Sequence, residues 1–212
     1  MPLESFRVEA ELTLDEKIAE GHHREVFRAD PYVWKILMPY RVKRRAGRTV
    51  RLPLQAYIEQ KHGIEDFNLH ELENYRRLDP HIPDGLRGSF NPVHWAGRYQ
   101  GHSVSLSDLV LNDDGSIARP LAQAGVILDE KFWSALDEME VFLTRCKMFL
   151  IGINRENLLV QNKNGVQLPV IVDYKWMGRE AFPYQFWLRY ETCLKQKLHR
   201  KFQRLRATRL QV

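Results

Sequence analysis

A short hairpin pattern near residue 160 constrains the fold of this chain more than any other feature. Two apolar runs, Leu158–Gln161 and Val170–Val172, flank Asn164-Gly165, which is typical of a tight turn between antiparallel strands. Asn157 precedes the first run and Asp173 follows the second. Because the strands of a hairpin run in opposite directions, its first and last residues meet at one end. The pattern therefore predicts that these two polar side chains face one cleft.

Two oxygen-bearing side chains at one end of a hairpin suit a magnesium ion. Magnesium prefers hard oxygen ligands and takes few of them from the protein, leaving the rest to water and phosphate. The simpler alternative is that Asn157 is a polar turn residue and Asp173 an ordinary residue at a strand end.

The rest of the chain alternates strand and helix patterns in an order that predicts an α+β fold. In the first half, β-rich runs predict an antiparallel meander, and apolar residues every three to four positions predict a helix closed by Asp79-Pro80. Two strands follow that helix, and the basic stretch before it is expected to be an exposed loop or helix start. These elements are Leu12–Ile18, Val26–Arg28, Tyr32–Leu37, 41–51, Ile64–Leu78, Val93–Gln100 and His102–Leu111.

The second half is predicted to hold a long helix, the hairpin and a basic, aromatic end. Asp129 is the expected cap of the long helix and Gly152 its expected end. A last helix is expected from about Phe186 onward. A β-rich first half and an α-rich second half predict two lobes, an N-terminal one over 1–111 and a C-terminal one over 112–212.

Lys35 and Glu71 form a second pair whose order along the chain matters. Lys35 lies among apolar residues of a predicted strand, where a buried cation needs a partner, although an exposed strand-edge lysine is the simpler alternative. Glu71 lies on the next predicted helix, whereas Glu73 should point elsewhere. Protein kinases hold ATP phosphates with a strand lysine paired to a helix glutamate, and hold magnesium with an asparagine and an aspartate. The order of these two residues and the hairpin pair resembles that arrangement.

Gly21 stands where such a site needs a loop that covers the phosphates. It lies five residues before Val26, as the second glycine of the kinase loop precedes its valine. Ala19 and Arg24 replace the first and third glycines, so an ordinary hairpin turn is an equal alternative. Arg24 and the neighbouring histidines could donate hydrogen bonds to a phosphate.

The residue expected to act as a base is absent. In the kinase catalytic loop an aspartate lies five residues before the metal-binding asparagine, and Gly152 occupies that position here. Residues 150–154 carry no titratable side chain that could accept a proton from a hydroxyl group. No residue is therefore assigned as catalytic. The acidic residues that could supply a base from elsewhere are Asp108, Asp113 and Asp114.

Five short segments share their order and spacing with one bacterial family. They are Gly21–Phe27, Trp34–Leu37, His70–Leu78, Asn157–Val160 and Pro169–Asp173. Over roughly 14–206 the chain thereby resembles the PhoP-regulatory-network protein YrbL family. The resemblance implies a protein-kinase-like two-lobe fold, with a β-rich N-terminal lobe and a reduced α-helical C-terminal lobe, that lacks the usual catalytic aspartate. It also implies a bacterial, cytoplasmic protein linked to the response to magnesium limitation.

The same resemblance implies ATP and Mg²⁺ as cofactors. The implied nucleotide-binding residues are Gly21, Lys35 and Glu71, and the implied metal ligands are Asn157 and Asp173. The favoured function is a kinase-like, nucleotide-binding regulatory protein, either a pseudokinase or a weak phosphotransferase. An active kinase for a protein or small molecule, with an atypical base, is the first alternative.

A third function, an interaction module without nucleotide, would use two basic segments. The net charge is +5, yet 41–51 hold six basic and no acidic residues, and 189–212 hold eight basic residues and one acidic residue. The remainder is net acidic, so the chain is not uniformly basic. The C-terminal segment could contact nucleic acid, an acidic surface or a protein partner, although a solvated helix face is the simpler interpretation and is favoured.

Few features point to a membrane or an oxidising compartment. No apolar run approaches the roughly 18 residues that a transmembrane helix requires, and the first residues lack the apolar stretch of a secretory signal. The two cysteines, Cys146 and Cys193, show no paired spacing, which suits a reducing compartment. We therefore expect a cytoplasmic protein.

Overall fold

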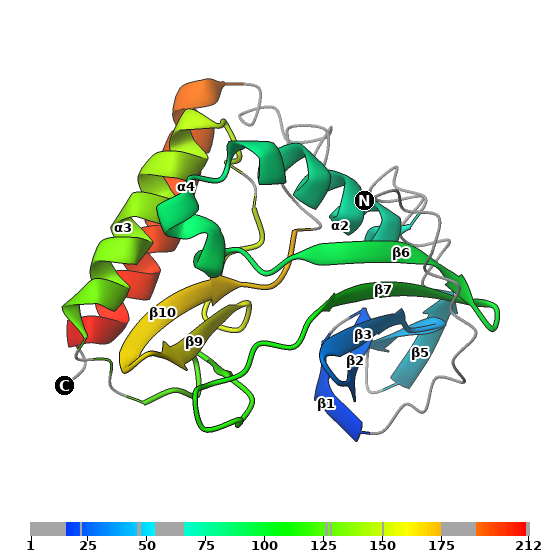
Figure 1. The fold of residues 1–212 in the computed structure, drawn as a ribbon. Helices are drawn as coiled ribbons and strands as arrows, with labels where there is room; N and C mark the ends of the chain where they lie inside the picture. The colour runs from blue at the N-terminus through cyan, green and yellow to red at the C-terminus, as the bar shows by residue number, and fades with distance from the viewer. Residues whose placement is uncertain are drawn as a thin grey trace.

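A five-stranded antiparallel sheet, in the order β1-β2-β3-β7-β6, forms most of the first half of the molecule (Figure 1). The computed structural model describes residues 16–210, apart from 22, 46–47, 54–65, 126, 128, 150 and 175–189. β3 pairs with β2 on one side and with β7 on the other, so two neighbouring strands at the centre of the sheet come from distant segments. The strands are β1 Glu16–Glu20, β2 Arg24–Ala29, β3 Tyr32–Leu37, β6 Val93–Tyr99 and β7 His102–Asp108.

Helix α2, Phe67–Leu78, lies against β3, β6 and β7 of this sheet. Asp66 caps it, since its carboxylate accepts hydrogen bonds from the backbone N–H groups of Asn68 and Leu69. The helix ends where Pro80 enters the short 3₁₀ helix η2, Asp79–His81, which leads to a second one, η3 Asp84–Ser89. The predicted helix is therefore confirmed over its described part, and its expected start at Ile64 lies outside the described residues.

In the second half α3 packs against β10 of a small sheet of order β10-β9-β8, and α4 packs against α3. The hairpin predicted from the sequence is present, and its register pairs Ile171 with Leu158. Asn157 and Asp173 therefore flank its open end, where the N–H of Val172 donates to the carbonyl of Asn157 at 3.2 Å. The elements are β8 Arg119–Pro120, α3 Glu130–Arg145, β9 Leu158–Lys163, β10 Val166–Ile171, α4 Glu191–Arg206 and the 3₁₀ helix η6 Ala207–Leu210.

One apolar core joins α2 to the helices of the second half. Buried side chains from α2, α3, α4 and the loop after α3 belong to a single cluster, to which Leu72, Leu136, Ile151 and Phe202 contribute. A separate, smaller cluster around Trp34 includes β3 and β7 residues of the five-stranded sheet. Because α2 contacts both the sheet and the main core, its inner face lies between the two halves.

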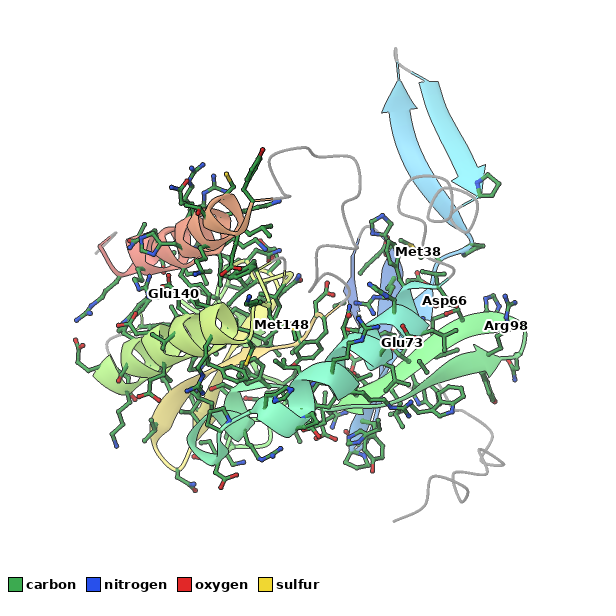
Figure 2. The ribbon with its side chains drawn as sticks, turned by 90° about the horizontal axis from the view of Figure 1, so that it is seen from above. Met38, Asp66, Glu73, Arg98, Glu140 and Met148 are labelled. Atoms are coloured by element: carbon green, nitrogen blue, oxygen red, sulfur yellow. The ribbon has the colours of Figure 1, made fainter. Side chains whose placement is uncertain are left out.

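The expectation of an exposed loop or helix start over 41–51 is wrong. This stretch contributes most of a two-stranded antiparallel hairpin, β4 Tyr40–Arg45 and β5 Arg48–Pro53, which projects from the body in Figure 2. β-Branched residues recur within it at Val42, Thr49 and Val50, and such residues favour strands. The high density of basic residues obscured that preference.

The expected end of the long helix at Gly152 is also wrong, because α3 ends at Arg145. Lys147 takes a left-handed backbone with φ of 59°, and the N–H of Met148 returns to the carbonyl of Leu143 at 2.9 Å. This hydrogen bond satisfies a carbonyl group of the last turn, and together with the left-handed residue it ends the helix. Phe149, Ile151 and Ile153 are then buried at every second position, the periodicity of an extended segment rather than of a helix.

The last helix, α4, is described from Glu191, and residues 186–189 of its expected start lie outside the described residues. No helix in the described part of the chain is long and apolar enough to cross a membrane. The division into lobes over 1–111 and 112–212 stays a prediction.

Asp66 gives a stability prediction. Replacing Asp66 with alanine should lower the free energy of unfolding by about 1–2 kcal/mol, the cost of losing a helix N-cap. Asp66 is 7% exposed and its carboxylate also accepts from the Ser103 hydroxyl at 2.7 Å, so the loss should reach the upper end. Asp129→Ala, at the half-buried cap of α3, is the matched control and should cost less, because less of that side chain is buried. Urea unfolding of both variants checks the order, and an equal cost would contradict it.

Candidate functional site

The carboxylate of Glu71 is the centre of a buried cluster of charges. Glu71 has no solvent exposure, and Lys35 Nζ donates to its Oε1 at 2.9 Å. Arg24 Nη1 pairs with Oε2, and the backbone N–H of Tyr174 donates to Oε1 at 3.2 Å. The predicted approach of Lys35 to Glu71 is therefore present, with a second cation on the other carboxylate oxygen. Glu73 lies on the exposed side of α2.

The inner face of α2 carries a polar stripe that brings the two halves together. Asn68, Glu71 and Asn74 recur at every third position, so they lie on one side of the helix. The Asn68 amide donates to the Lys35 carbonyl at 3.3 Å and to the Ser103 hydroxyl at 2.9 Å. The Asn74 amide donates to the carbonyl of Tyr174 at 2.7 Å. This stripe thus connects β3, β7 and the segment that follows β10.

Burial and the neighbouring charges change the pKa values of the groups in this cluster. Burial alone would raise the pKa of Glu71, but Arg24 and Lys35 together lower it, so the carboxylate is ionised. Burial lowers the pKa of Lys35 below the ordinary lysine value, against the attraction of Glu71. Burial opposes the charge of Arg24 too, yet Glu71 and Asp173 raise its pKa. Arg24 therefore carries a permanent positive charge at this site.

Asp173 and Asn157 come from the open end of the β9–β10 hairpin to the same place. The Asn157 amide donates to the Gly152 carbonyl at 2.8 Å and to Asp173 Oδ2 at 3.2 Å. Arg24 Nη2 lies 3.4 Å from Asp173 Oδ1. Lys35 Nζ also donates to the carbonyl of Val172 at 2.6 Å. The structure thereby places Lys35 and Glu71 beside the hairpin pair.

The hairpin pair has suitable chemistry for magnesium. Because the amide nitrogen of Asn157 donates to a carbonyl oxygen, its Oδ1 is the atom left for a metal, beside the carboxylate of Asp173. Asp173 is 6% exposed, and hard oxygen atoms of this kind are what magnesium selects. Among the described residues no group of three or more His, Cys, Asp or Glu side chains could hold a metal. A metal here would need further oxygen ligands from water or phosphate.

The loop between α3 and the hairpin has no acidic side chain at Gly152, and a lysine from α4 holds the loop in place. A Cβ atom added to Gly152 would meet Asn157 Nδ2 and the Asp173 carbonyl at 3.5 Å, which is ordinary contact, so the position borders the site without a side chain. Next to it, Lys201 Nζ donates to the carbonyl of Ile151. The pKa of Lys201 is lowered to about 8, first by burial and second by the positive charge of the nearby Lys197.

Gly21 lies in the exposed turn between β1 and β2, where its N–H donates to the Arg24 carbonyl at 2.8 Å. That hydrogen bond closes the turn between Gly21 and Arg24, the residue with the buried guanidinium. A role for Gly21 toward a phosphate stays a prediction, as do the roles of Lys35, Glu71, Asn157 and Asp173 toward a nucleotide and a metal.

The acidic residues considered as a replacement base lie elsewhere. Asp113 Oδ2 accepts from the N–H of Gly165, at the turn of the β9–β10 hairpin and thus at the opposite end from Asp173. Asp114 binds Ser116 within its own turn. Asp108 Oδ1 lies 2.6 Å from His94 Nε2.

Two residues of this region were not assigned to it from the sequence. Arg24 was considered only as a loop donor, because the strand that it begins, Arg24–Ala29, carries other charged residues and does not show which of them is buried. Lys201 lies in a run of basic residues on α4, and nothing local distinguishes it from its neighbours.

Removal of the Glu71 charge should be strongly destabilising. Glu71→Gln would leave two buried cations facing each other, and breaking a buried ion pair costs about 3–5 kcal/mol. Glu73→Gln, on the exposed side of the same helix, should change the free energy of unfolding by no more than about 0.5 kcal/mol. Urea unfolding measures both values. Similar losses for the two variants would refute the central role of Glu71.

Lys201 should make the free energy of unfolding increase with pH in the alkaline range. Its pKa is about 8 when folded and 10.5 in the ordinary state, so between these values the unfolded chain binds the extra proton. The free energy of unfolding should therefore increase from pH 8 to about pH 10.5. Lys201→Met should reduce that slope, and the exposed Lys195→Met should keep it. An unchanged slope in Lys201→Met would show that other groups cause it.

Comparison with known proteins agrees with the fold described above. No family model matches the chain, and no curated protein matches it. Among solved structures, PpkA-294 in its apo form superposes with a TM-score of 0.50 at 17% identity, covering 79% of this chain and 59% of that one. The bifunctional kinase-methyltransferase WbdD superposes with a TM-score of 0.50 at 18% identity, covering 86% of this chain and 34% of that one.

This chain thus spans less than two thirds of the length of either structure. At such identities the likeness concerns the fold alone. Together with the β-rich first half and the helical second part, it shows that the chain has an α+β, protein-kinase-like fold.

Proposed function

We propose that this chain is a kinase-like, nucleotide-binding regulatory protein. The observation that carries the proposal is the buried Lys35–Glu71 pair, which lies beside the Asp173 carboxylate in a protein-kinase-like fold. In this proposal Lys35 contacts the phosphates of ATP and Glu71 holds Lys35 in position. Gly21 belongs to the loop that covers the phosphates.

Asn157 and Asp173 would hold Mg²⁺ in this proposal, and their oxygen atoms suit that ion. When bound, Mg²⁺ would neutralise negative charge on the nucleotide phosphates. The residues of the chain position the groups that would contact the phosphates and the metal. Glu71 keeps Lys35 charged and aimed into the site, and the Gly152 carbonyl orients the Asn157 amide at 2.8 Å so that its oxygen faces away.

The absence of a carboxylate at Gly152 supports little or no phosphate transfer. Residues 151–154 of the loop carry no acidic side chain, and Asp113 and Asp114 lie at the other end of the hairpin. Lys201, which contacts the loop at Ile151, is a cation at neutral pH with a pKa of about 8. We therefore favour a pseudokinase or weak phosphotransferase over a fully active kinase.

Membership of the YrbL family, a bacterial origin and a cytoplasmic location belong to the same proposal. They rest on the five ordered segments of the sequence, each of which supplies one proposed site residue. The boundary between lobes at 111 and 112 is also proposed, on the change from a β-rich first half to an α-rich second half.

The pairing of the C-terminal helix disfavours a nucleic-acid or acidic-surface partner. Two arginines on α4 and η6 face acidic residues of α3. Arg206 pairs with Asp137 and Glu140, and Arg209 pairs with Glu130. The buried side of α4 belongs to the main apolar core. We infer that this basic segment mainly holds the helix in place.

Nucleotide binding gives the direct test. ATP with Mg²⁺, at about 100 times its dissociation constant, should raise the melting temperature by about 5–10 °C. Lys35→Met should abolish the rise because it removes the cation that meets the phosphates. Lys131→Met, on the exposed face of α3, is the control and should keep it. No shift at millimolar ATP, or an undiminished shift in Lys35→Met, would overturn the proposal.

A further inference from the structure

Arg24 places a positive charge where the proposed site would bind a metal. It begins β2 and is 7% exposed. One nitrogen of its guanidinium pairs with Glu71, and another lies 3.4 Å from Asp173 Oδ1. The Asn68 side chain accepts a further hydrogen bond from Arg24 at 3.1 Å, which orients the group. The guanidinium is therefore held between the two carboxylates by several contacts.

The second oxygen of Asp173 is engaged as well. Asp173 Oδ2 accepts from the Asn157 amide at 3.2 Å, so each carboxylate oxygen faces a donor from the chain itself. A divalent ion that approached Asp173 would meet the Arg24 charge on the same carboxylate. Two cations at this distance repel, and burial strengthens the repulsion because water screens it less.

The charge balance of the cluster leads to the same conclusion. Arg24 and Lys35 carry two positive charges, and Glu71 and Asp173 carry two negative charges, so the four groups in contact are neutral. Without Arg24 these groups would carry one negative charge beside Asn157. Arg24 thus removes the surplus negative charge that would attract a divalent cation.

We propose that Arg24 competes with a divalent cation for the Asp173 carboxylate and so sets the metal requirement of this site. The inference rests on the proposed metal ligands Asn157 and Asp173, and it does not depend on nucleotide binding. While Arg24 holds Asp173, metal alone binds weakly, and displacement of the guanidinium is part of metal binding.

Metal binding in the absence of nucleotide tests this inference. The probe is Mn²⁺ alone, with free Mn²⁺ measured by electron paramagnetic resonance during titration of the full chain. Arg24→Gln should bind Mn²⁺ roughly tenfold more tightly than the wild type, or more, because it removes a charge 3.4 Å from Asp173. Arg28→Gln makes the same substitution on the same strand, beside Asp30, and should bind as the wild type does.

A double variant identifies the ligand. Adding Asp173→Asn to Arg24→Gln should remove the gain, since the carboxylate exposed by the first substitution is then lost. Glu71 keeps Lys35 and the Tyr174 N–H as partners without Arg24, so Arg24→Gln should fold. Arg24→Met retains a long apolar stem and serves as a second variant with the same expected gain, so that either folded protein decides the question.

Two results would overturn the proposal. One is Mn²⁺ binding by folded Arg24→Gln or Arg24→Met that is no tighter than in the wild type. The other is a gain that persists with Asp173→Asn. Failure of nucleotide binding can be told apart from both, because ATP binding is measured separately by thermal shift. A protein that binds ATP without the Mn²⁺ gain contradicts only the role of Arg24, and the reverse result contradicts only the proposed function.

Discussion

The ionised carboxylate of Glu71 is the group on which the arrangement of the site depends. A charge without solvent exposure is costly unless donors surround it, and here Arg24, Lys35 and the Tyr174 N–H do so. Those donors come from β2, β3 and the segment after β10. Because they must all converge on one side chain of α2, the helix, the sheet and the hairpin are held in one relative position.

The charged groups around Glu71 lie beside an apolar core that continues into the second half of the molecule. Leu72, Tyr75 and Leu78 of α2 pack into the core that α3 and α4 share, while Asn68 and Glu71 bind the sheet. The helix therefore supplies non-directional burial on one side and directional hydrogen bonds on the other. The burial contributes most of the stability, and the hydrogen bonds determine which strands and loop the charged groups meet.

Much of the fold followed from local patterns, whereas the grouping of the main site residues followed from their order along the chain. The hairpin was recognisable because Asn164-Gly165 separates two β-rich runs, and α2 because its apolar periodicity ends at Asp79-Pro80. Local patterns failed where a competing signal was stronger. Dense positive charge hid the β4–β5 hairpin, and apolar residues after Arg145 were assigned to α3 although they are buried at alternate positions of a loop.

The amino-acid sequence alone established that Lys35 would need a partner and in what order the main site residues occur, because residue type and spacing are properties of the chain. It could not decide which of the available partners each would take. Arg24 meets Glu71, 47 positions away, and also Asp173, while Lys201 reaches the loop at Ile151, 50 positions away. Contacts over such separations depend on how the sheet, α2 and α4 pack, since burial removes water as the competing partner only after these elements have come together.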